Sequence, residues 1–314
     1  MQSSEPKVVI LATGGTIAGT AASAADHTGY TAAQLGVAQL VAAVPPLAGL
    51  PIETEQVAQI DSKDMDVAVW LALAHRAAFH LARPDVAGVV VTHGTDTLEE
   101  TAYFLQRVLA PTKPLVLTAA MRPATSLQAD GPQNLLDAVT VARLPGARGV
   151  VAVLAGTVHA ARDLRKRHSY RVDAFASGDA GPIGYVEEGR LRQLRDWPLC
   201  EPAGLERLAA QPWPAVEIVT SHAGTGGVLV RAAVASGVRG LVIAATGNGT
   251  VHHALTAALL EAQRAGVTVW RCTRCLDGPV LGKPDDALQS AGTLTPVQAR
   301  IELQLQLMGA APQC

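Results

Sequence analysis

The feature that most constrains the fold is a short apolar run, rich in β-branched residues, that recurs along the first half of the chain. Each run ends in small or polar residues, which is typical of buried parallel strands. Segments compatible with helices follow, and this alternation predicts an α/β fold with right-handed crossovers. The predicted strands and the residues that end them are 7–12 with 13–16, 89–91 with 92–96, 115–117 with 118–121, and 150–154 with 155–157.

Helices are predicted between and after these strands. Residues 66–81 are rich in Ala, Leu and His and lack Gly and Pro, and residues 134–143 and 252–265 are also compatible with helices. Gly266 is expected to end the last of these. Thr97 and Glu100 have the spacing of a capping box, in which Thr97 caps the helix and Glu100 bonds back to the cap residue.

The alternation breaks down between residues 187 and 214, where four prolines lie among polar residues. A second strand-and-helix series then begins, with predicted strands at 216–220 and 241–245. We therefore predict a larger N-terminal domain with a mostly parallel sheet and flanking helices, over residues 1–190. A linker over 191–214 and a smaller C-terminal α/β domain over 215–314 complete the prediction.

The composition fits such a core and argues against several classes of partner. Of the 314 residues, 49% are apolar but only 4% are aromatic, so Ala, Val, Leu and Ile must build the core. A formal net charge of -2 gives no basic face for nucleic acid or anionic lipid. No stretch of 18 apolar residues is present, so we expect no membrane partner.

The cysteines and the first residues bear on the compartment. Four cysteines are too few for a disulfide scaffold, and the Cys272-x-x-Cys275 pair lacks both a second pair and a redox context. We interpret it as structural or incidental. Residues 1–7 carry an acid and a proline where a signal peptide needs an apolar segment. The protein is expected in the cytoplasm, or in the periplasm or outside the cell if a leader has been removed.

Chemistry is expected just after the strands, because loop amides and helix N-termini converge there in open α/β sheets. The residues at these positions are mainly hydroxyls, namely Thr13, Thr16, Thr92, Thr95 and Thr118, together with Asp96. No His, Cys and carboxylate cluster has metal spacing, and the glycines at 14–19 fit no nucleotide-binding loop. We therefore expect neither metal nor cofactor, and hydroxyl chemistry instead.

For any single threonine, a cap or a strand-end hydrogen bond is the simpler interpretation. Thr16 and Thr95 stand out because glycines precede both and permit close backbone approach by a ligand. A threonine hydroxyl is a weak nucleophile that needs a base or a proton-accepting network. The basic run 162–168 is by itself most simply interpreted as a solvated surface.

Two segments closely resemble the signature motifs of bacterial-type L-asparaginases. They are Leu11-Ala12-Thr13-Gly14-Gly15-Thr16-Ile17-Ala18-Gly19 and Thr92-His93-Gly94-Thr95-Asp96-Thr97-Leu98-Glu99-Glu100-Thr101-Ala102. Further matching segments run in family order through nearly the whole chain: 61–65, 119–123, 129–135, 247–249 and 290–294. Each is weak alone, but together they are highly specific.

The resemblance implies a two-domain α/β fold, a homotetramer, and active sites formed where two protomers meet. It implies that Thr16 is the nucleophile on a mobile loop that includes Tyr30, and that Thr95, Lys166 and Asp96 form a second catalytic group. The residues that it implies for substrate binding are Gly15, Asp61, Ser62, Gly94, Thr95, Asp96, Ala120 and Asn248.

These implied roles are chemically coherent. Asp96 would accept the substrate's α-ammonium, Ser62 would hold its α-carboxylate, and the Ala120 carbonyl would orient the side-chain amide. A lysine partly buried beside Thr95 would have a lowered pKa and could accept a proton. Loop amides near Gly15 and Thr95 would stabilise an oxyanion, an effect of roughly 3 kcal/mol per donor.

The implied activity is hydrolysis of L-asparagine to L-aspartate and ammonia through a threonine acyl-enzyme. The sequence leaves open which of Thr16 and Thr95 attacks first. Members that accept glutamine or asparagine often bring an Asn and a Glu from the neighbouring protomer to the α-amino group. Asn248 fits the first, but residues 277–286 offer no Glu, which puts glutamine hydrolysis in doubt.

Three alternatives to this interpretation remain. A glutaminase-asparaginase would use the same site with a looser pocket. A tRNA-dependent amidotransferase subunit shares the fold but carries extra N-terminal sequence, whereas the first predicted strand here begins at Lys7. A non-catalytic asparagine-binding protein would bind the amino acid without releasing ammonia.

Overall fold

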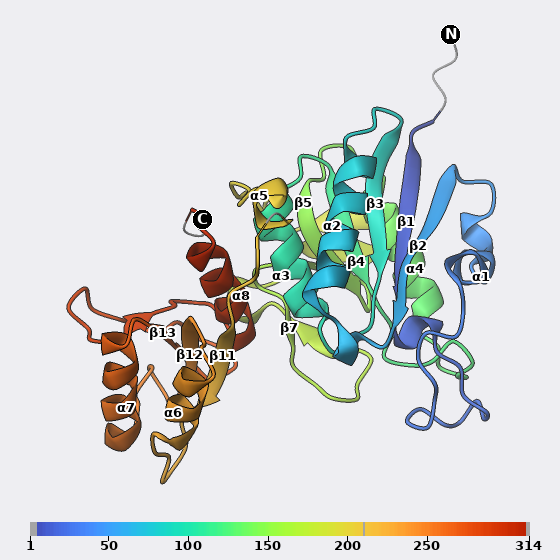
Figure 1. Ribbon diagram of the computed structural model, residues 1–314. Coiled ribbons are helices and arrows are strands. Elements are labelled where there is room, and N and C mark those ends of the chain that lie inside the picture. Colours follow the sequence, from blue (N-terminus) through green and yellow to red (C-terminus); the bar gives the residue numbers. More distant parts are fainter. Residues whose placement is uncertain (1–4, 210, 312–314) are drawn as a thin grey trace. The chain divides into compact units, whose positions relative to one another are not determined.

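The computed structural model describes residues 5–209 and 211–311. The chain divides into two compact units, Met1–Leu205 and Glu206–Gln313, and each is described by itself (Figure 1). Both are built from a sheet with helices, so the predicted α/β class is confirmed. In the part of the chain that the structure describes, none of the helices has the length and apolar character needed to cross a membrane.

The N-terminal unit is organised around an eight-stranded sheet of order β10-β9-β6-β5-β4-β3-β1-β2. The strands β1 to β5 pair in parallel, whereas β6, β9 and β10 are antiparallel. Their bounds are β1 Lys7–Gly14, β2 Ile52–Ile60, β3 Val86–Thr92, β4 Pro114–Thr118, β5 Gly149–Leu154, β6 Thr157–Ala160, β9 Gly184–Glu187 and β10 Arg190–Gln193.

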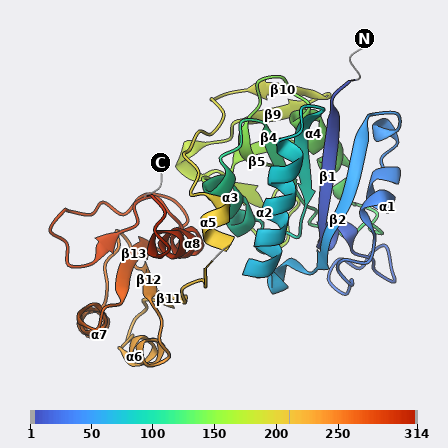
Figure 2. The same cartoon turned by 45° about the horizontal axis from the view of Figure 1, so that its top comes forward.

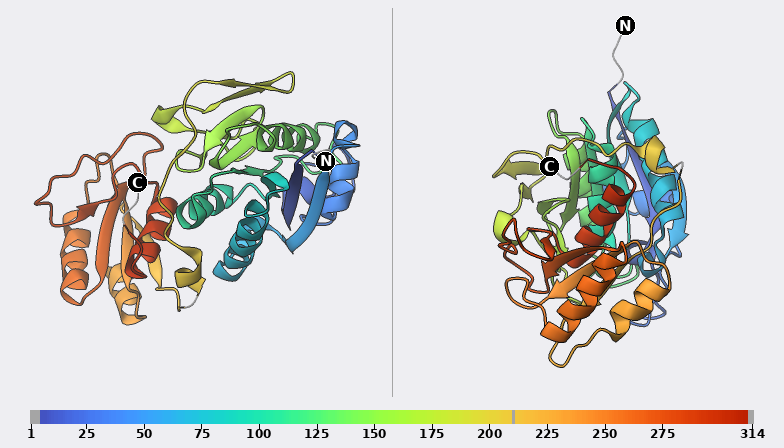
Figure 3. Two further views of the ribbon diagram at one scale, coloured as in Figure 1. Left: turned by 90° about the horizontal axis from the view of Figure 1, so that it is seen from above. Right: turned by 60° about the vertical axis from the view of Figure 1, so that its left-hand side comes forward.

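Helices cover both faces of this sheet (Figure 3). The helices α2 (Val67–Leu81) and α3 (Leu98–Leu109) pack together on one face, and α1 (Val37–Ala42) and α4 (Gly131–Ala142) lie on the other. Because both faces are covered, the central strands have no polar side, and β3, β4 and β5 are buried almost throughout. Covered parallel strands explain why the sequence shows continuous apolar runs instead of alternation.

The antiparallel end of the sheet was not predicted. Residues 184–193 form a hairpin whose turn, Glu188-Gly189, has positive φ at both positions (48° and 71°), as a tight hairpin requires. Its second strand, β10, therefore lies inside the stretch expected to be irregular. A separate two-stranded sheet pairs β7 (Arg165–Lys166) with β8 (Phe175–Ala176). The short helix α5 (Leu205–Ala209) follows.

The C-terminal unit contains a second, four-stranded sheet of order β11-β12-β13-β14, parallel throughout. The helices α6 and α7 lie on one side of it and α8 on the other (Figure 2). The bounds are β11 Val216–Thr220, α6 Val228–Ala235, β12 Gly240–Ala245, α7 His253–Arg264, β13 Thr268–Thr273, β14 Gln289–Ser290 and α8 Pro296–Leu307.

Of two predictions made about helix ends, the one for Gly266 is confirmed and the one for Thr97 is wrong. Gly266, at φ 86°, follows α7 as expected for a left-handed residue that ends a helix. Thr97 does precede α3, but its side chain makes no capping hydrogen bond, so the predicted capping box is wrong. The Thr97 hydroxyl instead donates to the Ser62 carbonyl at 2.8 Å. A contact 35 residues away thus overrides the local capping pattern.

Candidate active site

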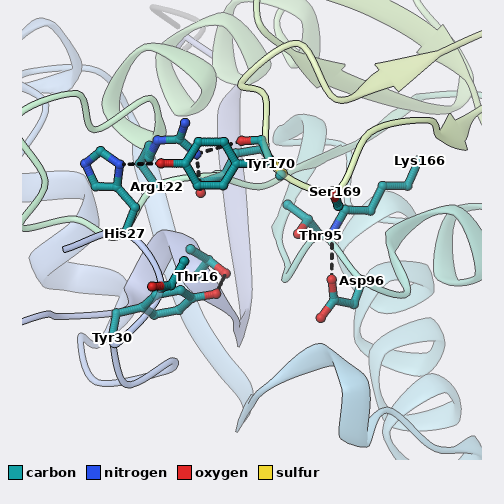
Figure 4. A pocket seen from close by; sticks show the side chains of 11 residues that line it. Thr16, His27, Tyr30, Thr95, Asp96, Arg122, Lys166, Ser169 and Tyr170 are labelled. Carbon is teal, nitrogen blue, oxygen red and sulfur yellow. Dashed lines mark hydrogen bonds and ion pairs between the residues drawn. The ribbon is translucent and has the colours of Figure 1, made fainter.

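The carboxyl ends of β1, β3 and β4 deliver side chains to one pocket of about 230 Å³ (Figure 4). The loop before α1 and the segment that begins with β7 contribute the rest of its lining. The residues that line it are Thr16, His27, Thr28, Tyr30, Thr95, Asp96, Met121, Arg122, Lys166, Ser169 and Tyr170. Five of these, Thr16, Tyr30, Thr95, Asp96 and Lys166, are the residues to which the resemblance assigned catalysis.

Glycines allow the loops after β1 and β3 to touch. Gly15 has φ 81°, and a Cβ there would lie 2.3 Å from the Cα of Gly94. A Cβ at Gly94 would lie 2.4 Å from Ser62 Oγ, in the loop after β2. Only residues without side chains permit such an approach. The three loops that end β1, β2 and β3 therefore form one packed unit under the pocket.

The first hydroxyl of the pocket is that of Thr16, which opens the short 3₁₀ helix Thr16–Ala18. Its Oγ1 lies 2.7 Å from the Tyr30 hydroxyl, and either atom can be the donor. Thr16 is buried, with 7% of its surface exposed, and what remains open faces the pocket. The pair is a nucleophile candidate with a second hydroxyl in position to hold or pass on its proton.

A second hydroxyl group lies across the pocket. The Lys166 ammonium donates to Thr95 Oγ1 at 2.8 Å and to Asp96 Oδ1 at 2.6 Å. The Lys166 side chain is 18% exposed and that of Asp96 is 56% exposed. The basic run that looked like a solvated surface thus turns one of its members inward. The arrangement supplies a hydroxyl, an amine and a carboxylate within hydrogen-bonding reach of one another.

Ser62 makes two hydrogen bonds to the turn formed by residues 95–97. Its buried Oγ accepts a hydrogen bond from the Asp96 backbone N–H at 3.2 Å, so the hydroxyl proton is free to be donated elsewhere. Its carbonyl accepts from Thr97. Together the two bonds fix the turn that carries Thr95 and Asp96.

The turn that contains Ala120 is held by the start of α4. The Asp130 carboxylate accepts hydrogen bonds from the N–H groups of Met121 and Arg122, both at 2.9 Å. Asn134 donates to the Ala119 carbonyl at 2.9 Å. Burial raises the pKa of Asp130, although the two N–H donors act in the opposite direction. The peptide groups around Ala120 are thereby fixed in orientation.

Two titratable side chains, the partly buried Glu99 and the fully buried His93, lie next to the turn that carries Thr95 and Asp96. Burial raises the pKa of Glu99 to about 7, and its carboxylate accepts the Lys166 backbone N–H at 3.0 Å. Burial lowers the pKa of His93 to about 4, so this imidazole is neutral at neutral pH. Glu99 therefore places a titratable carboxyl beside the lysine that faces Thr95.

Other strand-end threonines have the simpler role. Thr13 Oγ1 donates to the Thr92 carbonyl at 3.1 Å, and Thr118 Oγ1 donates to the Val153 carbonyl at 2.8 Å. Both bonds join neighbouring strands. The Gly15 N–H donates to the Ile60 carbonyl at 2.9 Å, so this amide is already used to join β1 to β2. The oxyanion role predicted for amides near Gly15 stays a prediction for its neighbours.

Of the eight predicted binding residues, only Thr95 and Asp96 line the pocket. Gly15, Gly94 and Ala120 belong to the loops that carry lining residues, and Ser62 is hydrogen-bonded to Asp96, whereas Asp61 and Asn248 make other contacts. The Asp61 carboxylate faces Lys63, with a nitrogen-to-oxygen distance of 3.3 Å. Asn248 belongs to the C-terminal unit, in the turn after β12, where its Oδ1 accepts the Leu281 N–H at 2.7 Å. The roles assigned to both residues stay predictions.

The Cys272–Cys275 pair differs in environment: Cys272 is buried, with its pKa raised to about 12 by burial, and Cys275 is exposed. Within residues 5–209 and 211–311, no three His, Cys, Asp or Glu side chains are grouped so as to hold a metal ion.

Comparison with known protein families identifies the family to which both units of the chain belong. Residues 7–198 match the family model for the asparaginase N-terminal domain, and residues 215–311 match that for the glutaminase/asparaginase C-terminal domain. The chain belongs to the asparaginase family. The resemblance inferred from the motifs is therefore confirmed.

Relatives within the asparaginase family match over nearly the full length. L-asparaginase 2 of Escherichia coli (strain K12) is 39% identical over 96% of this chain and 89% of its own. A glutaminase-asparaginase of Pseudomonas fluorescens biotype A is 38% identical over 94% and 84%. A crystal structure of a probable cytoplasmic L-asparaginase from Campylobacter jejuni covers 97% of this chain and 96% of its own, at 37% identity and a TM-score of 0.92.

Several lining residues of this asparaginase were not singled out from the sequence. His27, Ser169 and Tyr170 lie in segments without helix or strand, and no local pattern marks them. Arg122 lies in the segment 119–123, which resembles the family, but the resemblance implied no role for it. Their place in the pocket depends on where distant loops meet, which periodicity does not reveal.

Proposed function

We propose that this protein hydrolyses the side-chain amide of L-asparagine to L-aspartate and ammonia, with Thr16 as the nucleophile. The observation that carries the proposal is the pair of hydroxyls facing one pocket, each with its own proton partner. Thr16 has Tyr30 at 2.7 Å, and Thr95 has Lys166 at 2.8 Å. Acyl transfer to a hydroxyl and then to water needs a proton partner in each half of the reaction, and two such pairs can serve one half each.

The proposed reaction has two stages. Thr16 Oγ1 attacks the amide carbonyl to form a tetrahedral intermediate, and its proton passes by way of the Tyr30 hydroxyl to the amide nitrogen. The C–N bond then breaks, ammonia leaves, and the ester on Thr16 remains. Water then attacks the ester carbonyl, and its proton passes through the Thr95 hydroxyl to Lys166 in its neutral amine form. The bond to Thr16 Oγ1 breaks, aspartate leaves, and that proton returns from Lys166 to Thr16. The backbone N–H groups of Thr16 and Thr95 are the proposed donors to the oxyanion.

Charged and polar groups beside these hydroxyls complement the α-ammonium and the α-carboxylate of asparagine. Asp96 Oδ1 is engaged by Lys166, and its exposed carboxylate is proposed to accept the substrate's α-ammonium through Oδ2. The Ser62 hydroxyl proton is proposed to be donated to the α-carboxylate, since its oxygen already accepts from Asp96. The Ala120 carbonyl is proposed to orient the amide.

Substituting the nucleophile tests the proposal. Thr16→Ala is expected to lower ammonia release from asparagine by at least about 10³-fold while asparagine still binds, because binding groups remain and the attacking oxygen is lost. Acid quenching of the wild-type reaction followed by peptide mass analysis should find the aspartyl ester on Thr16. An ester on another residue would overturn the assignment.

A matched control lies in the strand that precedes the nucleophile. Thr13→Val removes a hydroxyl that only joins neighbouring strands, and its kcat is expected to stay within about threefold of wild type. If Thr13→Val were as inactive as Thr16→Ala, loss of activity would report disturbed packing and not loss of the nucleophile.

A glutaminase-asparaginase of broader specificity is the second candidate. Its support is the relative of that name, which is as similar to this chain as the L-asparaginases are. The ratio of kcat/KM for asparagine and glutamine decides between the two. A ratio near one would favour the broader enzyme, and a ratio above about 100 the specific one.

We further propose a homotetramer in which Asn248 of one protomer serves the pocket of another. Light scattering after size exclusion measures the mass of the particle. Asn248→Ala is expected to raise KM for asparagine without changing that mass. Relatives are named both cytoplasmic and periplasmic, and the cytoplasm is our proposed compartment.

A further inference from the structure

The loop that carries Tyr30 has almost no apolar anchorage. Not one residue of the segment 20–31, here called the Tyr30 loop, is buried, whereas the 3₁₀ helix just before it is buried throughout. Outside a single bridge between Thr20 and Thr31, the loop contains no strand or helix. A segment without buried side chains opens at low free-energy cost. Its position over Thr16 therefore depends on a few polar contacts.

Most of those contacts lie at the loop's base and on one flank. The bridge between Thr20 and Thr31 closes the base with hydrogen bonds of 3.0 and 2.9 Å. On the flank, the Ala21 N–H donates to Thr125 Oγ1 at 2.9 Å, and the Leu127 N–H donates to the Ala24 carbonyl at 3.2 Å. None of these contacts involves residues 27–30, which form the wall of the pocket.

Besides the bond from Tyr30 to Thr16, His27 supplies the contacts at that wall. One ring nitrogen lies 3.0 Å from Ser126 Oγ. The other lies 3.1 Å from the Tyr170 hydroxyl (Figure 4). A neutral imidazole offers one donor and one acceptor, and each hydroxyl can serve as either, so both bonds form in either tautomer. The imidazole thus joins the Tyr30 loop to two separate segments of the chain.

Tyr170 is itself held in place by a buried cation. The Arg122 guanidinium lies 4.1 Å from the Tyr170 ring centroid and donates to the Tyr170 carbonyl at 2.7 Å. Arg122 is 6% exposed, and its backbone N–H is fixed by Asp130. A guanidinium over an aromatic face is attractive, and more so when it is shielded from water. The half-exposed Tyr170 therefore presents its hydroxyl to His27 from a fixed position.

We propose that Tyr170 and His27 form a latch that keeps the Tyr30 loop closed over Thr16, so that both act as positioning residues for the reaction. The latch closes the wall three residues before Tyr30, and Tyr30 is the residue that contacts the nucleophile. In the described part of the chain, opening it leaves residues 27–30 hydrogen-bonded to other segments only through the His27 bond to Ser126 and the Tyr30 bond to Thr16, while the base of the loop stays attached. This inference rests on the proposed function for its kinetic consequence but not for its structural one.

The variant Tyr170→Phe removes the latch hydroxyl and leaves the ring beneath Arg122. One hydrogen bond lost from the closed state is expected to speed amide hydrogen exchange of residues 27–30 by about two- to tenfold. The same factor is expected as a fall in kcat/KM for asparagine. The urea midpoint of unfolding should not change, because the bond joins two surface segments. A purely structural role would shift that midpoint.

Tyr185→Phe is the matched control. Tyr185 lies in β9, and its ring also carries a guanidinium, that of Arg192 at 5.1 Å. Exchange of residues 27–30 and the kinetic constants are expected to match wild type in this variant. Faster exchange there would mean that any tyrosine hydroxyl in the unit has the same effect, which would overturn the latch.

A double variant makes the inference sharper. If His27 and Tyr170 act through one bond, adding Tyr170→Phe to His27→Ala should change neither the exchange rate nor kcat/KM further. Additive effects, or unchanged exchange in Tyr170→Phe alone, would overturn the proposal. If wild type released no ammonia from asparagine, the proposed function would fail, while the exchange measurements would still decide the latch.

Discussion

A buried chain of three side chains behind the catalytic loop gives the most quantitative prediction. The Trp70 indole donates to Thr101 Oγ1 at 2.9 Å, and Thr101 Oγ1 lies 2.9 Å from His93 Nε2. An indole can only donate, so the Thr101 hydroxyl accepts from Trp70. The Gly94 carbonyl can only accept, so the neutral His93 ring accepts at Nε2, and the Thr101 hydroxyl donates to it. His93 Nδ1 then carries its proton and donates to the Gly94 carbonyl at 2.7 Å. The chain ends one residue before Thr95.

Thr101→Val keeps the shape of the side chain and removes the central hydroxyl. Two buried polar atoms, Trp70 Nε1 and His93 Nε2, would then lack partners, and each costs about 1–3 kcal/mol. Neither ring is free to turn toward water. The Trp70 ring stacks on that of Phe104, with 5.0 Å between the ring centroids, and the His93 ring is hydrogen-bonded to the Gly94 carbonyl. The expected loss of unfolding free energy is about 2–6 kcal/mol.

Urea unfolding followed by tryptophan fluorescence measures this loss. Because the chain has two units, the value is taken from the transition that reports the N-terminal unit, which contains Trp70. In a Trp70→Phe background the substitution orphans only His93, so its cost should fall to about 1–3 kcal/mol. Thr140→Val, which removes a hydroxyl bonded within α4 to the Leu136 carbonyl, is the control and should cost under about 1 kcal/mol. A change below about 0.5 kcal/mol in Thr101→Val would refute the reasoning.

Three further predictions concern pH and close packing. Burial lowers the pKa of His93 and His159 to about 4, so the unfolded chain binds protons first, and each should cost up to about 3 kcal/mol of stability as pH falls from 6.5 to 4 in urea titrations. Burial raises the pKa of Glu99 to about 7, so this carboxyl stabilises the fold below pH 4.5 and loses that effect as pH rises through 7. The unfolding free energy of wild type relative to Glu99→Gln should therefore fall by about 1–3 kcal/mol between pH 4.5 and 8, a comparison in which the histidine contributions cancel. Gly94→Ala places a Cβ 2.4 Å from a hydroxyl oxygen and should lower kcat/KM about 10- to 100-fold, whereas Gly226→Ala, with open space around it, should match wild type in the same assay.

The strands and the family were readable from the sequence because their signals are local. Covered parallel strands must be apolar along their length, so the runs near residues 7–12 and 89–91 identify themselves. Glycines at 15 and 94 mark points of close approach, which the structure places against each other. The hairpin at 184–193 was not predicted because a short antiparallel pair of strands at the end of the sheet has no such apolar run.

The sequence predicted only part of the candidate site. Sequence alone placed a hydroxyl after each of several strands, but it did not separate Thr16 and Thr95 from Thr13 and Thr118 by environment. Only the structure shows that Thr13 and Thr118 bond to neighbouring strand carbonyls, whereas the other two face the pocket. A hydroxyl's role depends on the distance to groups 14 to 79 residues away, and no short pattern encodes that.

The sequence by itself determined which segments become strands and that hydroxyls stand at their ends, because backbone preference and burial are properties of neighbouring residues. The tertiary structure decided that Lys166 turns inward to Thr95 and that Thr97 bonds Ser62 instead of capping α3. It also decided that His27 meets Tyr170, 143 residues further on. These choices are made where loops from different strands converge, and the competition among polar partners there is settled by geometry that exists only once the sheet has formed.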